Sequence, residues 1–176
     1  MSTKTIILFS LWTSFWSAVF YHFYNMFFDF GIPWIMFICL GIYFAMGLKP
    51  RQSPGLLLSA YCGLLWGQVD FLLIFLFGTV MGMSTAAASF VAIILGTAVS
   101  MYIHLKPLSK TPLRHMPIIF AGVCLTFSQG GKNVPGLFVT FFCGILLAAI
   151  CSAGQLYLMK KFPLEEKSQD GNVSSN

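Results

Sequence analysis

The sequence PGLLLSAYCGLLWG at residues 54–67 decides the fold, because a related sequence, PGLFVTFFCGILLA, follows 81 residues later at residues 135–148. Six of the fourteen aligned positions are identical. Small residues recur at every fourth position: these are Gly55, Ser59, Gly63 and Gly67 in the first copy and Gly136, Thr140, Gly144 and Ala148 in the second. On a helix this spacing forms a narrow groove that another backbone can approach closely. The chain is therefore interpreted as a duplicated helical protein whose halves pack along these stripes.

The composition indicates that most of the chain contacts lipid. Of its 176 residues, 57% are hydrophobic and 9% are charged, with a mean hydropathy of +0.82. A soluble domain is about one quarter charged. The net charge of +5 does not indicate nucleic-acid binding, because the basic residues lie between apolar runs rather than on one face. The five cysteines fall inside apolar segments, so we expect neither disulfides nor a metal site, and no cofactor.

A helix needs about 20 residues to cross about 30 Å of hydrocarbon. Breaks that contain glycine, proline or lysine divide the chain into six apolar segments, at roughly 5–28, 33–48, 54–77, 84–104, 116–130 and 135–159. We predict an all-α polytopic membrane protein with six transmembrane helices in one domain over residues 1–163. The polar segment 164–176 is expected to be a disordered cytoplasmic tail.

The repeat offset pairs the first predicted helix with the fourth, the second with the fifth and the third with the sixth. Repeat one covers about 5–80 and repeat two about 84–160. Three spans per repeat is an odd number, so the copies should cross the membrane in opposite directions, as in the inverted repeats of many transporters and channels. Accidental alignment of two apolar helices is the alternative, and the shared Pro-Gly-Leu and Cys-Gly positions favour duplication.

The basic residues predict an orientation. Nine of them fall on one side of a six-span protein: Lys4, Lys49, Arg51, Lys106, Lys110, Arg114, Lys160, Lys161 and Lys167. The opposite loops hold Lys132 alone. This bias places both termini in the cytoplasm.

Two motifs carry a resemblance to a known family. The run Ile42-Tyr43-Phe44-Ala45 precedes the first small-residue helix, and Thr126-Phe127-Ser128-Gln129-Gly130 precedes the second. Together they resemble the bacterial inner-membrane family typified by YcdZ, a domain of unknown function, and the likeness covers most of residues 5–160. The resemblance implies a small multi-pass protein of the bacterial inner membrane. It implies no activity, and Ser128 departs from the small residues expected in the second motif.

Asp70 is the acid that lies inside an apolar segment, where a charge costs about 2.5–3.5 kcal/mol on insertion scales. It lies about 6 Å beyond the middle of its helix, and His22 lies about 8 Å beyond the middle of the first helix. A His22–Asp70 pair could form a proton relay or polar gate. A single structural hydrogen bond, or a neutral Asp70, is the alternative.

The second and fifth predicted helices are short and end in glycine, which points to a site at the repeat interface, although tilt alone also explains short helices. The pore or solute-binding candidates are Asp70, His22, Gln68, Trp66, Phe44, Ser128, Gln129 and Asn133. His104 and His115 flank a basic loop and are expected to lie in water. The stripe Ala88, Ala92, Gly96 and Ser100 is expected to pack within the chain or between copies.

The sequence is compatible with two functions. The first is a small channel or transporter for a small neutral or weakly ionised solute, assembled as a homo-oligomer. The second is a structural or regulatory membrane subunit that binds partner helices through its small-residue stripes. No phosphate loop, nucleophile elbow, paired carboxylates or metal-ligand spacing is present in the sequence, so we do not expect an enzyme.

Overall fold

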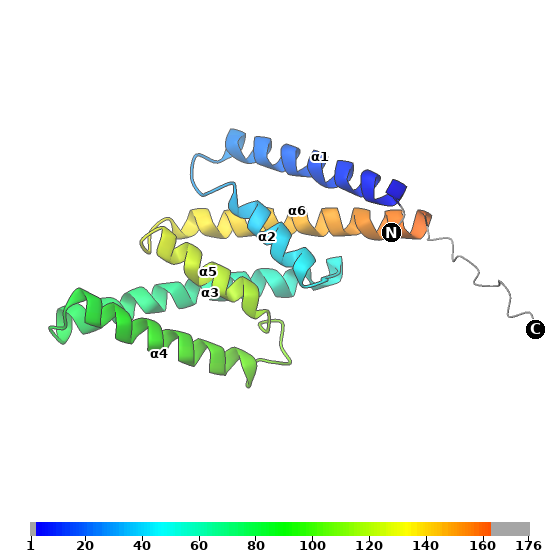
Figure 1. Ribbon diagram of the computed structural model, residues 1–176. Coiled ribbons are helices and arrows are strands. Elements are labelled where there is room, and N and C mark those ends of the chain that lie inside the picture. The colour runs from blue at the N-terminus through cyan, green and yellow to red at the C-terminus, as the bar shows by residue number, and fades with distance from the viewer. Residues whose placement is uncertain (1–2, 163–176) are drawn as a thin grey trace, which may run out of the picture.

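The computed structural model describes residues 3–162, and every regular element in that range is a helix. The predicted tail at 164–176 lies outside the described residues. The elements are α1 (Thr3–Phe27), α2 (Ile35–Ala45), η1 (Pro50–Gln52), α3 (Ser53–Phe75), η2 (Leu76–Val80), α4 (Thr85–Leu105), α5 (Met116–Ser128) and α6 (Val134–Lys161) (Figure 1). The expectation of an all-helical chain is confirmed.

Four stretches are long and apolar enough to cross a membrane: α1, the continuous run Pro50–Val80 built on α3, α4 and α6. The two remaining helices are shorter than the predicted 33–48 and 116–130. Helix α2 has 11 residues and α5 has 13, which correspond to about 17 and about 20 Å. Neither reaches the ~30 Å of a hydrocarbon core as a straight helix.

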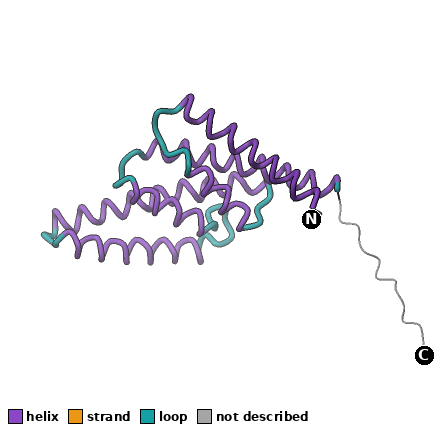
Figure 2. The backbone as a smooth tube through the Cα atoms, turned by 45° about the horizontal axis from the view of Figure 1, so that its top comes forward, coloured by secondary structure: helices purple, strands orange, loops and turns teal. Residues whose placement is uncertain are grey.

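The long helices lie side by side in the order α1, α6, α3, α4, and each short helix crosses one of the two central ones (Figure 1). Helix α2 packs on α6, and α5 packs on α3. Figure 2 shows the same arrangement after a turn of 45°. Helices α3 and α6, which carry the repeated sequence, are therefore the centre of the structure.

Successive helices alternate in direction along the bundle (Figure 1). The amino end of α1, η1, the loop 106–115 and the carboxyl end of α6 lie at one end, and the loops 28–34 and 129–133 lie at the other. Contacts agree with this arrangement, because the ammonium of Lys4 lies 4.8 Å from the ring centre of Phe162. Most of the basic residues are consequently gathered at one end.

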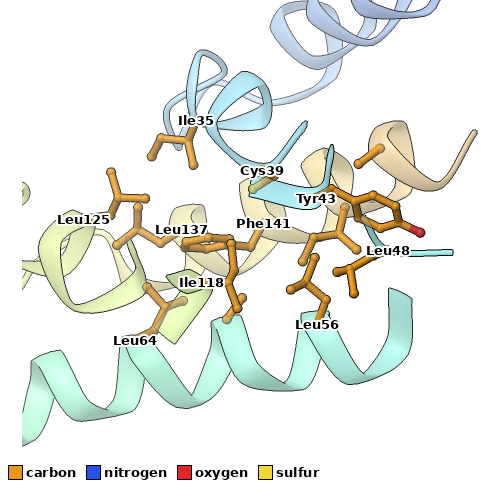
Figure 3. Close-up of a cluster of buried hydrophobic side chains, with 13 residues drawn as sticks. Ile35, Cys39, Tyr43, Leu48, Leu56, Leu64, Ile118, Leu125, Leu137 and Phe141 are labelled. Atoms are coloured by element: carbon orange, nitrogen blue, oxygen red, sulfur yellow. The ribbon is translucent and has the colours of Figure 1, made fainter. Parts of the chain in front are cut away.

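The core lies where α2 and α5 approach α3 and α6 (Figure 3). It consists of buried apolar side chains, among them Ile35, Tyr43, Leu64, Ile118 and Phe141. Hydrophobic packing, rather than a polar path, therefore occupies the space between the two short helices in the described part of the chain. No site therefore lies directly between α2 and α5 in this part of the chain, and the two short helices cover the core instead.

The small-residue stripes allow backbones to touch. A β-carbon at Gly63 would collide with the carbonyl oxygen of Ile119 and lie 2.8 Å from its Cα, and one at Gly122 would lie 2.9 Å from Gly63 Cα. In the other half, a β-carbon at Gly144 would lie 2.9 Å from Met36 Cα and from Cys39 Cβ. The α3–α5 and α2–α6 contacts both depend on glycine, which has no side chain to separate the backbones.

In each stripe, a residue with a hydroxyl group, Ser59 or Thr140, forms a hydrogen bond to the loop that precedes a short helix. Ser59 donates a hydrogen bond to the carbonyl oxygen of Pro112 at 2.9 Å, in the loop before α5. Thr140 accepts one from the backbone N–H of Ile32 at 3.3 Å, in the loop before α2, and its hydroxyl lies 2.7 Å from that of Tyr24. Both buried hydroxyls thus have partners.

We predict that Gly63→Ala and Gly144→Ala each lower the free energy of unfolding by about 1–3 kcal/mol, the usual cost of overpacking. The matched control is Gly41→Ala in α2, where a β-carbon meets nothing within 4 Å. Because alanine has a higher helix propensity than glycine, the stability of that variant should be unchanged or increase by up to about 1 kcal/mol. Reversible SDS titration of the purified protein measures all three. Equal stability of the three variants would show that the helices at Gly63 and Gly144 have room for a β-carbon.

Candidate functional site

Asp70 lies on the buried face of α3, with 3% of its surface exposed. Its Oδ1 atom has no hydrogen-bond partner among residues 3–162. A buried polar atom without a partner is rare, because the desolvation cost is not repaid. Such an atom makes Asp70 a candidate functional residue.

Gly96 of α4 makes room for the Asp70 carboxyl group. A β-carbon at Gly96 would collide with Oδ1 and lie 2.9 Å from Cγ. The buried face of α4 contains Ala88, Ala92, Gly96 and Ser100, so this stripe packs within the chain, against α3. Of the two expectations for the stripe, packing inside the chain is the one that the structure bears out.

Asp70 lies in a groove of about 340 Å³ between α3, α4 and α5. We call it the Asp70 groove; its lining residues are Asp70, Ile93, Thr97, Ser100, Phe120, Val123, Cys124 and Phe127. The walls are largely apolar, and the carboxyl group, two hydroxyls and a thiol are the polar groups. An ionised carboxylate only accepts hydrogen bonds, whereas a protonated one also donates, so the groove can receive a donor or an acceptor according to protonation.

The structure does not bring His22 to Asp70. His22 lies on an exposed face of α1, and α1 packs mainly on α6, which separates it from α3 (Figure 1). The relay predicted from similar depth is wrong, because depth along two helices does not determine which faces meet.

The histidine on the buried face of α4 is His104, which is 1% exposed. Its Nδ1 lies 2.6 Å from the carbonyl oxygen of Leu113, and its Nε2 accepts a hydrogen bond from Trp66 Nε1 at 3.0 Å. An indole N–H can only donate, so Nε2 carries no proton and Nδ1–H donates to Leu113. The sulfur of Cys62 lies 3.5 Å from the same Nε2.

The expected exposure of His104 and His115 to water is therefore wrong, since His115 is also only 7% exposed. The sequence contains a signal for His104. It stands four residues after Ser100, and continuing the stripe of α4 by one more turn would have placed it on the buried face.

The remaining candidates make local or structural contacts. Gln68 donates to the carbonyl oxygen of Gly131 at 3.1 Å and ties α3 to the loop before α6. Ser128 donates to Leu125 in its own helix, and Gln129 lies next to Ser128. Asn133 has a left-handed backbone with φ of 55° directly before α6. Phe44 stacks edge-on against Phe9 and does not line the Asp70 groove.

The fold and the groove define a class: an α-helical protein with several helices of membrane-spanning length and a buried carboxyl group between them. Residues 7–155 match the family described as "Protein of unknown function (DUF1097)", and the chain belongs to that family. Neither the curated proteins nor the solved structures contain a match to the chain. The family agrees with the expected family of unknown function, and the narrower YcdZ-like assignment stays a prediction.

We predict that Trp66→Phe lowers the free energy of unfolding by about 1–3 kcal/mol, because it leaves the buried Nε2 of His104 without its indole donor. Trp34→Phe is the control, since Trp34 is 51% exposed and its indole makes no hydrogen bond within residues 3–162. It should change stability by less than about 0.5 kcal/mol. Thermal unfolding in a mild detergent compares the two, and equal losses would argue against the hydrogen bond.

Proposed function

We propose that this protein is a small channel or transporter of the cell membrane for a small neutral or weakly ionised solute, and that the Asp70 groove is where the solute binds. The observation that carries the proposal is Asp70, whose buried Oδ1 has no partner in the described chain and whose residue lines a groove of about 340 Å³. A solute that donates a hydrogen bond to this carboxyl group would offset its desolvation.

The proposed architecture is an inverted repeat of three helices. In this repeat, α1 corresponds to α4, α2 to α5 and α3 to α6. The helix contacts follow the same correspondence: α3 packs on α5 as α6 packs on α2, and α3 packs on α4 as α6 packs on α1. The correspondence extends to single residues. Gly55 packs near Pro112 and Gly136 packs near Gly31, and Pro112 and Gly31 are themselves 81 residues apart. These matches support duplication, and such folds often bind solutes between their halves.

The proposed orientation has both termini in the cytoplasm of a bacterial cell, with the chain crossing the inner membrane six times. The clustering of basic segments at one end of the bundle supports it. Helices α2 and α5 would cross only as part of longer segments that include their flanking turns, because the helices themselves are too short.

The runner-up, a subunit that binds partner helices through its stripes, has less support. The small residues of α3, α4 and α6 are engaged by α5, α3 and α2 within the chain. A homo-oligomer remains part of the proposal for a different reason. The Asp70 groove opens at the surface of one chain, where Ile93 is 44% exposed, and a second copy would enclose it.

Flux measurements test the proposal. We expect purified protein in proteoliposomes to carry at least one member of a panel of small amides, weak acids, ions and water, and Asp70→Asn to reduce that flux by about tenfold or more, equivalent to about 1.4 kcal/mol. Asp29→Asn, which changes an exposed acid at a loop, is the control and should keep the flux. Absence of flux for the whole panel, or equal loss in both variants, would remove the proposal.

Labelling of single cysteines tests the orientation. On a background without the five native cysteines, Ser109→Cys in the loop 106–115 should react only with reagents that reach the cytoplasm, and Lys132→Cys only with impermeant reagents added outside. Both positions are exposed, so reactivity reports sidedness rather than burial. Labelling of both from the same side would exclude the six-span inverted arrangement.

A further inference from the structure

The loop 106–115 forms a second, chemically different pocket at the basic end of the bundle. The pocket has a volume of about 270 Å³ and is lined by Gln52, Lys110, Thr111, Pro112, Arg114 and His115. Neither carboxyl group of the described chain, Asp29 or Asp70, belongs to this lining. The pocket therefore presents cationic and hydrogen-bonding groups to whatever enters it.

The cationic groups of the pocket have no partners inside the described chain. The side chains of Lys110 and Arg114 make no hydrogen bond or ion pair within residues 3–162. His115 is 7% exposed, and its ring also makes no hydrogen bond in that range. Because His115 lines the pocket, a ligand bound there could accept a hydrogen bond from its imidazole N–H.

The electrostatics of the pocket favour an anion. Burial and the nearby guanidinium of Arg114 lower the pKa of His115. Burial is the larger cause, and an anion between these groups would offset the smaller one, the repulsion between the guanidinium and a protonated imidazole. Gln52 and His115 also stand directly before α3 and α5, so the amino ends of two helices, with their partial positive charge, meet at the pocket.

Hydrogen bonds from α3 and α4 hold the loop that forms the pocket. Ser59 on α3 donates a hydrogen bond to the carbonyl oxygen of Pro112, and His104 on α4 donates one to that of Leu113. Gln52 accepts a hydrogen bond from the backbone N–H of Lys49 at 2.9 Å through Oε1, and its NH2 group makes none within the described chain. A preorganised loop with free donors loses little entropy when it binds a ligand.

We propose that this pocket binds a phosphate group, through Lys110, Arg114, His115 and the Gln52 amide. Phosphate suits the donors because Arg binds its oxygens with two parallel hydrogen bonds and Lys adds a point charge. The group can belong to the headgroup of an anionic phospholipid, which basic pockets at the cytoplasmic ends of membrane helices bind, or to free phosphate. The site requires no transport by the Asp70 groove, so the two proposals succeed or fail separately.

Binding by the full-length protein in neutral detergent tests the proposal with two probes. The first is inorganic phosphate, titrated calorimetrically against a chloride control of equal ionic strength. The second is phosphatidylglycerol, measured by native mass spectrometry and compared with phosphatidylcholine. Binding of phosphate alone identifies the free anion as the ligand, binding of phosphatidylglycerol alone identifies the headgroup, and either result supports the site.

Substitutions locate the binding. Arg114→Gln and Lys110→Gln should each weaken binding by about tenfold or more, because each removes a charge-assisted hydrogen bond. Lys106→Gln removes the same charge from the same loop but lies outside the pocket, over the ring of Tyr102, and should keep the affinity. Lys110 is exposed, so its variant should fold even if Arg114→Gln does not. Absence of binding to both probes, or equal weakening by Lys106→Gln, would overturn the proposal.

Discussion

The backbone contact between α3 and α5 at Gly63 and Gly122 is the constraint on which the rest of the structure depends. No side chain separates the two helices there, so the 13-residue α5 lies directly across α3. This crossing brings the loop before α5 over Ser59, which fixes the pocket of Lys110, Arg114 and His115. It also brings Phe120 and Phe127 to the side of Asp70, where they form one wall of the groove. Both sites therefore depend on the same pair of glycines.

The two proposed repeats share one packing arrangement and differ in chemistry at a buried position. Position 70 holds an acid in the first copy, and position 151, which is 81 residues later, holds a cysteine. Both residues are buried on the central helices, where α3 faces α4 and α6 faces α1. A buried thiol is a small apolar group that needs no partner, whereas a buried carboxyl group needs one. In the proposed duplication, Asp70 thus gives the first half a buried polar group that the second half lacks at the matching position.

The sequence predicted the features that depend on composition and spacing. The long apolar helices follow from hydropathy, and the buried faces of α3 and α6 follow from Gly63, Gly144 and their neighbours at every fourth position. The pairing of His22 with Asp70 failed because depth along a helix is set by residue number, whereas the facing direction is set by tertiary packing. His104 was missed for a related reason. A histidine next to a basic loop suggests water, and only the contact with Trp66 shows that it is buried.

Helix α4 occupies the outer edge of the row of long helices, and its backbone packs mainly on α3 and η2. An element with one principal neighbour loses few contacts when it tilts, in contrast to α3, which is held by α4, α5 and α6. The tightest point of the α3–α4 interface is Gly96 against the carboxyl group of Asp70. The carboxyl end of α4 is held by the hydrogen bond from His104 to Leu113. An outward tilt of α4 about that end would move Gly96 away from the carboxyl group of Asp70. The exclusion of water from a single acid therefore depends on the placement of one peripheral helix.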